Sequence, residues 1–123
     1  MKFIDSNIIA YAFYCNEHTD ACQKLIQEGG IIDTFNLTEA FFIIEKEVNR
    51  EYAQKVIRGL LKSSLVIVDV TPNLIFETLR RTGKYKLSIF DLIHYTCALM
   101  SGCVSVVSFD KDFDGLEIPR EEP

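Results

Sequence analysis

Four acidic side chains, spread along the chain, have the right chemistry to bind one hard cation together. Carboxylate oxygens favour Mg²⁺ or Mn²⁺, and no His or Cys occupies a matching position that would select zinc instead. Several carboxylates within a few ångströms repel one another, so a cluster is tolerated chiefly when a divalent cation binds or some acids are protonated. The four residues are Asp5, Glu39, Asp91 and Asp110.

The expected secondary structure brings these four acids to one place. Asp5 follows the first predicted strand, and Asp110 follows a later apolar strand at 104–107. Glu39 and Asp91 are each expected in the first turn of a helix. In right-handed β/α units, the helix N-termini and the carboxyl ends of the strands share one edge of the sheet, where ligands bind. We therefore predict that the acids meet at that edge.

Each of the four acids also has a purely structural interpretation. Helix capping could explain three of them, and a tight turn could explain the fourth. The sequences concerned are Asp5 itself, Asn36-x-x-Glu39, Ser88-x-x-Asp91 and Asp110-Lys111-Asp112. Taken singly, either interpretation is open, and it is the repulsion among four gathered carboxylates that favours a metal site.

Alternating strands and helices predict an α/β domain around a parallel sheet. Short β-branched apolar runs indicate strands, and apolar residues at helical spacing with cap signals such as Thr71-Pro72 indicate helices. Strands are expected at 3–4, 31–32, 65–68, 104–107 and 116–118, with 65–68 fully buried, and helices near Ile8, Thr19, Asn36, Ala53, Pro72 and Ile89, the last capped by Ser88.

One predicted helix is more apolar than a short helix in a small domain requires. Part of its stripe is therefore expected to pack against a second copy of the chain. The stripe consists of Ala53, Val56, Ile57, Leu60 and Leu61.

Length and composition indicate the number of domains and the class of protein. The 123 residues, 48% of them hydrophobic, suffice for one core, so we expect a single domain spanning 1–123. No apolar run approaches the roughly 20 residues that span a bilayer, and Asp5 comes too early for a signal peptide, so a cytoplasmic protein without a membrane segment is expected. The four cysteines lack Cys-x-x-Cys spacing and are expected to be buried thiols.

The net charge of −5 argues weakly against a nucleic-acid partner, because phosphate binding requires Lys and Arg. Bound cations at an acidic cluster would reverse the local field and weaken that objection. The densest basic stretch lies just before the Asp91 helix and is a candidate RNA contact, although a solvated helix end is the commoner role. It contains Arg80, Arg81, Lys84 and Lys86.

Four segments together resemble PIN-domain ribonucleases, especially the stand-alone toxins of VapBC toxin–antitoxin pairs. These segments are 3–9 (Phe-Ile-Asp-Ser-Asn-Ile-Ile), 37–39 (Leu-Thr-Glu), 88–94 (Ser-Ile-Phe-Asp-Leu-Ile-His) and 107–113 (Val-Ser-Phe-Asp-Lys-Asp-Phe). The resemblance implies a three-layer α/β/α sandwich with strand order 3-2-1-4-5, usually as a homodimer. It further implies an Mg²⁺- or Mn²⁺-dependent endoribonuclease acting on RNA phosphodiester bonds, with an antitoxin protein as a possible partner.

By the same resemblance, Asp5, Glu39, Asp91 and Asp110 take the acidic positions. Asp5 and Asp91 are expected to bind metal directly, while Glu39 and Asp110 complete the shell or orient water. Three further polar residues have expected positions or roles. Asn7 matches a polar position near the metal, Asp112 could replace Asp110 or hold metal through water, and His94 is expected to be structural rather than a ligand.

Two other interpretations remain open. The segment 66–72 resembles the phosphorylation strand of a receiver domain, with Asp69 as the acceptor. Such domains need paired acids after the first strand and a Lys after the last, and both are missing here. The other alternative is a PIN-like module that binds RNA or protein without cleaving, and the presence of all four acids argues against it.

Overall fold

A computed structural model describes all residues, 1–123. Five parallel strands form one sheet in the order β3-β2-β1-β4-β5, which is the order that the resemblance to PIN-domain ribonucleases implies. The strands are β1 (Lys2–Ile4), β2 (Ile31–Asp33), β3 (Val66–Val68), β4 (Ser105–Val107) and β5 (Arg120–Glu121). The helices are α1 (Ser6–Tyr11), α2 (Thr19–Glu28), α3 (Thr34–Glu47), α4 (Arg50–Leu61), α5 (Pro72–Leu79), α6 (Ile89–Met100) and the short 3₁₀ helix η1 (Lys111–Phe113).

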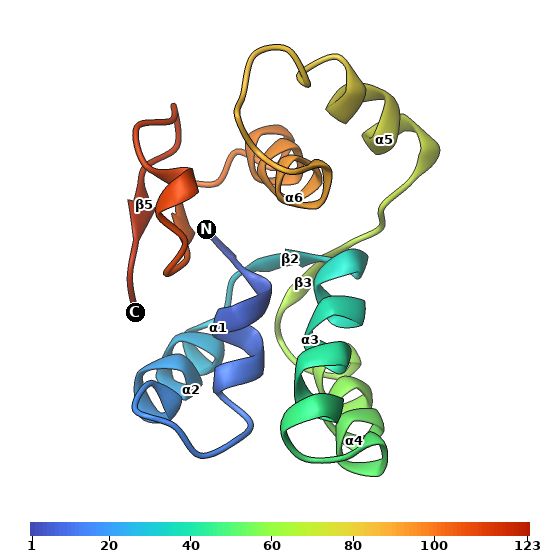
Figure 1. Cartoon of the computed structure of the whole chain (residues 1–123), viewed down its shortest axis with the longest axis vertical. Helices are drawn as coiled ribbons and strands as arrows, with labels where there is room; N and C mark the ends of the chain where they lie inside the picture. Colours follow the sequence, from blue (N-terminus) through green and yellow to red (C-terminus); the bar gives the residue numbers. More distant parts are fainter.

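Helices cover both faces of the sheet, which confirms the three-layer sandwich. In Figure 1, α1 to α4 lie on one side of the strands, and α5 and α6 lie on the other. Alternate strand residues point to opposite faces, so each face contributes to its own core. Ile4, Ile32 and Val107 join the core beneath α1 to α4, whereas Phe3, Ile31 and Val106 join the core beneath α5 and α6.

The register of the strands determines which residues lie side by side at the carboxyl edge of the sheet. Phe3 is paired with Ile31 on one side and with Val106 on the other. Asp33, the last residue of β2, and Ser108, the residue directly after β4, each lie two residues beyond a partner of Phe3 and are therefore level with Asp5. The backbone N–H of Asp5 donates to the carbonyl oxygen of Val107 at 3.0 Å, which extends the β1–β4 pairing to this edge.

Helix caps follow the sequence signals in α5 and α6 but not in α3. The side chains of Thr71 and Ser88 accept the N3 backbone N–H of α5 and α6, as expected. Helix α3 begins at Thr34 and not at Asn36, because Asp33 caps it in a reciprocal capping box with Asn36. The expected Asn36-x-x-Glu39 box is therefore wrong, and Glu39 lies in the second helical turn instead of the first.

Two strand expectations need correction. Strand β3 is not fully buried, because it lies at one end of the sheet, and Val66 is 44% exposed. The last strand is β5, not 116–118. The backbone N–H of Ile118 donates to the hydroxyl of Tyr95 at 3.0 Å, so that segment bonds to a side chain in place of the strand ladder.

The apolar stripe of α4 packs mainly inside its own chain. Ala53, Val56 and Leu60 are buried in the core beside α3, and Ile57 packs against that core. Leu61 is exposed, so it is the one large residue of the stripe that is still free to pack against a second copy. Three cysteines are buried as expected, but Cys15 is exposed, and none is paired. None of the helices is long and apolar enough to cross a membrane.

Candidate active site

Asp5 lies at the junction of β1 and α1, where it caps the helix. Its Oδ1 accepts the backbone N–H of Ser6 at 2.8 Å, and its Oδ2 accepts the hydroxyl of Ser108 at 2.6 Å. The residue is 7% exposed, and this burial raises the pKa of its carboxyl despite both hydrogen bonds. Asp5 therefore fulfils the expected cap, and each oxygen keeps lone-pair capacity for a further partner.

Asp91 and Asp110 share an electrostatic environment with Asp5. Asp91 is half-buried in the first turn of α6. Burial raises the pKa of Asp91 most, the charge of Asp5 raises it further, and that of Asp110 adds to this, against the hydrogen bond with Ser88. Such coupling requires proximity. These three predicted acids therefore lie close enough to interact electrostatically, although they come from three separate segments.

Glu39 is connected to Asp5 through Ser6. The hydroxyl of Ser6 donates to Glu39 Oε1 at 2.6 Å, while the backbone N–H of the same residue donates to Asp5. The negative charge of Glu39 also contributes to raising the pKa of Asp5. All four predicted acids therefore lie at one edge of the sheet.

A buried histidine lies on the inner side of Glu39. His94 Nε2 lies 2.5 Å from Glu39 Oε1, and His94 Nδ1 lies 2.6 Å from Asp33 Oδ2. Burial alone would lower the pKa of His94, but the hydrogen bonds and charges of the two carboxylates raise it to about 10. The imidazole is therefore a cation at neutral pH. The same partner outweighs desolvation at Glu39 and lowers the pKa of that carboxyl.

Asp33, Ser6 and Ser108 belong to the site but were not predicted from the sequence. Asp33 directly follows the apolar pair Ile31-Ile32, just as Asp5 follows β1. That equivalence was the available signal, since parallel strands end at a common edge. Nothing in the residue pattern distinguished the two serines from ordinary polar residues beside a helix start.

The donor set suits a hard divalent cation, because it consists of carboxylates, and neighbouring carboxylates help to raise the pKa of both Asp5 and Asp91. No three His, Cys, Asp or Glu side chains converge closely enough to hold a metal ion as they lie. Asp112 is exposed, and its backbone N–H donates to Asp110 Oδ1 at 2.9 Å in the expected Asx turn. Asn7 is also exposed. Asp112 therefore contacts the acidic cluster only through this backbone N–H.

The predicted basic stretch is largely neutralised by neighbouring acids. Arg80 and Arg81 pair with Glu77, and Lys84 pairs with Glu117 at 3.0 Å. These pairs are solvent-accessible and therefore weak. Lys86 is exposed, makes no ion pair, and lies two residues before the cap of α6. It is the one member of the stretch without an acidic partner.

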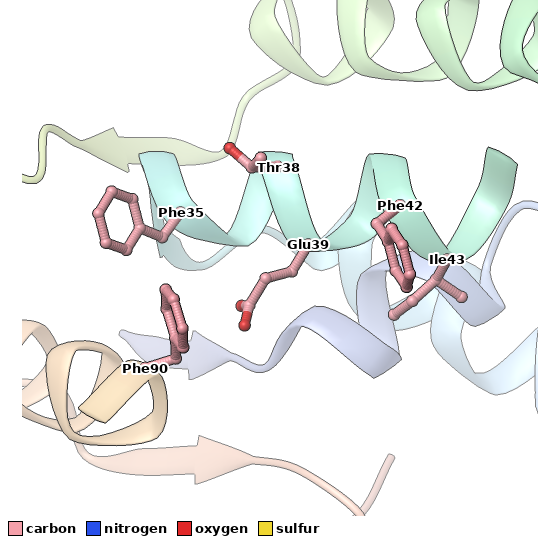
Figure 2. Close-up of a pocket in the computed structure, with 6 residues that line it drawn as sticks. All are labelled: Phe35, Thr38, Glu39, Phe42, Ile43 and Phe90. Carbon is pink, nitrogen blue, oxygen red and sulfur yellow. The ribbon is translucent and has the colours of Figure 1, made fainter. Parts of the chain in front are cut away.

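An apolar groove of about 470 Å³ opens beside Glu39. Figure 2 shows the Glu39 carboxylate between the ring of Phe90, from α6, and the side chains of Phe42 and Ile43, from α3. Phe42 and Phe90 are 67% and 53% exposed. The acidic edge is thus bordered on one side by a surface of exposed aromatic rings.

Comparison with known proteins places this chain in a family. No curated protein sequence matches the chain. Among solved structures, the chain is similar to Mycobacterium tuberculosis VapC20, described as a sarcin–ricin loop cleaving toxin, with a TM-score of 0.83, 16% identity and complete coverage of both chains. The model of the PIN domain family matches residues 2–118. That match covers nearly the whole sequence, and the chain therefore belongs to the PIN domain family.

Proposed function

We propose that this chain is an Mg²⁺- or Mn²⁺-dependent endoribonuclease that hydrolyses RNA phosphodiester bonds. The observation that carries the proposal is the coupling of Asp91 to Asp5 and Asp110 at the carboxyl edge of the sheet. Carboxylates that oppose one another's ionisation form a poor stabilising motif but a suitable site for a divalent cation. Membership of the PIN domain family is consistent with this chemistry.

A cation bound at these acids would polarise the scissile phosphate and lower the pKa of a bound water. The chain's own part is to hold the ligands in place. Ser6 and Ser108 fix the carboxylate of Asp5, which together with Asp91 is our choice of direct ligand. Glu39 Oε1 is engaged by hydrogen bonds, which leaves Oε2 to bind metal or to orient water, and Asp110 would complete the shell.

We further propose that the protein is the toxin of a toxin–antitoxin pair, acting on RNA in the cytoplasm. The support is the similarity of the whole fold to VapC20, a toxin that cleaves the sarcin–ricin loop. An antitoxin protein and a second copy of the chain are the proposed partners. Light scattering of the isolated protein tests self-association, and a monomer at high micromolar concentration would contradict the homodimer.

Cleavage of a panel of structured and single-stranded RNAs, with Mn²⁺ or with chelator, tests the enzymatic proposal. Asp5→Asn and Asp91→Asn should each abolish metal-dependent cleavage and leave the fold intact, because an amide is a poorer ligand for a hard cation. Asp69→Asn is the matched control, since Asp69 is exposed after β3 and should be dispensable.

The alternative function is a PIN-like module that binds RNA without cleaving it. RNA binding by the wild type with no cleavage at any Mn²⁺ concentration would favour that alternative. A receiver domain is excluded, because flavodoxin-like receivers have strand order 2-1-3-4-5, whereas this sheet has the order 3-2-1-4-5.

A further inference from the structure

Five polar residues at the acidic edge form a closed ring of hydrogen bonds. Starting from Asp33, one arm passes through His94 to Glu39 Oε1, with distances of 2.6 and 2.5 Å. The other arm passes through Asn36, whose backbone N–H donates to Asp33 Oδ1 at 3.0 Å and whose Nδ2 donates to Ser6 Oγ at 2.8 Å. Ser6 Oγ then donates to Glu39 Oε1 at 2.6 Å, which closes the ring.

The ring joins four elements and is buried except at one member. Asp33 ends β2, Asn36 and Glu39 lie in α3, Ser6 begins α1 and His94 lies in α6. The side chains of His94 and Asp33 are 1% and 0% exposed, whereas that of Glu39 is 34% exposed. Glu39 is therefore the point at which the ring meets solvent, and both arms end on the same one of its two oxygens.

Stability alone does not explain so many buried polar groups. Taking charged groups out of water costs free energy that their mutual attraction barely recovers, so apolar residues of similar volume serve a core at least as well. Here the buried polar groups converge on a single carboxylate oxygen beside the proposed metal. Their arrangement leaves Glu39 Oε2 as the oxygen without an intramolecular partner.

We infer that Asp33 and His94 are positioning residues that fix Glu39 Oε1, so that Oε2 alone is available to the metal or its bound water. The inference rests on the proposed function, because it assigns Glu39 a role at that metal. His94 lies in α6 and therefore supports Glu39 from the helical layer on the opposite face of the sheet. His94 itself does not touch the metal or the RNA.

Two neutral substitutions of His94 separate positioning from simple structural support. The amide nitrogen of Gln reaches the place of Nε2 and can still donate to Glu39, whereas that of Asn reaches the place of Nδ1 and can donate only to Asp33. Both variants lose the positive charge. If His94 positions Glu39, His94→Gln should keep kcat near that of wild type, and His94→Asn should lower kcat about 10–100-fold, the usual effect of losing a partner of a metal ligand. KM for RNA should not change.

Thr96→Val is the matched control. Thr96 lies in the same helix, and its fully buried hydroxyl has no hydrogen-bond partner, so its loss should alter neither kcat nor metal affinity. Melting temperatures of all variants in chelator show whether activity merely follows stability. If His94→Gln and His94→Asn lose activity in proportion to their melting temperatures, His94 is structural and the inference is overturned.

A double-mutant cycle with Glu39→Gln shows whether His94 acts through Glu39. Once Glu39 is neutral, adding His94→Asn should cost nothing more in kcat or in Mn²⁺ affinity measured by titration calorimetry. Losses that multiply would overturn the inference and leave the ribonuclease proposal standing. If the wild type binds Mn²⁺ and the variants show this non-additivity in Mn²⁺ affinity, but no RNA is cleaved, the ribonuclease proposal is overturned and the inference stands. A wild type that neither binds Mn²⁺ nor cleaves would overturn both.

Discussion

Replacing Asp91 by Asn should leave the metal-free protein at least as stable as wild type at pH 7. The folded-state pKa of Asp91 is raised by burial and by the charges of Asp5 and Asp110. A raised carboxyl pKa means that stability is lost as the pH rises through it, so ionised Asp91 opposes folding at pH 7. Asn removes that cost.

Two opposing terms set the magnitude of this effect. A carboxylate in the first turn of a helix contributes about 0.3–1 kcal/mol through the helix dipole, and Asn loses it. The cap itself survives, because Ser88 accepts the backbone N–H of residue 91, which Asn also has. The loss that must be offset by removing the repulsion between Asp91 and its neighbouring carboxylates is therefore about 1 kcal/mol at most. We expect a melting temperature equal to wild type or a few degrees higher.

Added Mn²⁺ should reverse the order of the two proteins. Binding stabilises the native state by RT ln(1 + [L]/Kd), about 2.7 kcal/mol at a hundredfold excess over Kd. For a chain of this size that corresponds to roughly 10 °C in melting temperature. Wild type should gain this shift, and Asp91→Asn should gain much less. In chelator, the advantage of Asn should shrink as the pH falls through the raised pKa, because the wild-type carboxyl then becomes neutral too.

Thermal melts followed by circular dichroism, with chelator and with Mn²⁺, supply the test. The reasoning is refuted if Asp91→Asn melts lower than wild type in chelator and Mn²⁺ shifts neither protein. The four acids would then be helix caps and turn formers, as each could be when considered singly.

Three further outcomes follow from the structure. The pKa of His94 is about 10 in the folded protein and near 6.5 unfolded, so urea denaturation should show stability lost as the pH rises through about 10, and less so in His94→Gln. Among the cysteines, only Cys15 is exposed, so a thiol reagent should label one cysteine in the native protein and four in denaturant. Gly30→Ala should destabilise by about 1–3 kcal/mol in urea titrations, because its Cβ would lie 2.9 Å from the Lys2 carbonyl oxygen.

The sequence was most informative where a local pattern has one physical solution. Short β-branched runs alternating with amphipathic helices predicted a parallel sheet, and Thr71-Pro72 and Ser88 predicted two helix starts that the structure confirms. Placing acids at strand ends and helix starts then brought Asp5, Asp91 and Asp110 to one edge, since that rule depends only on the topology.

The rest depended on competition between partners that are distant in the sequence. Asn36 was a plausible cap, but Asp33, which directly follows Ile32, caps this helix instead. Asp33 also forms a hydrogen bond with His94. The backbone of Ile118 was expected in a strand, but the hydroxyl of Tyr95, 23 residues away, takes its N–H. Hydrogen bonds between residues so far apart in the sequence produce no periodic pattern from which they could have been predicted.

The separation of the interior into two cores has a consequence for motion at the acidic edge. Asp5 and Glu39 are carried by the layer of α1 to α4, whereas Asp91 is carried by α6 on the opposite face. A slight sliding of one layer over the sheet would thus change the spacing of the acids without disrupting either core. The bond from His94 to Glu39 crosses between the layers and resists that sliding. Amide hydrogen exchange in α6 and α3 should therefore rise together when this bond is removed, even though the two helices belong to different cores.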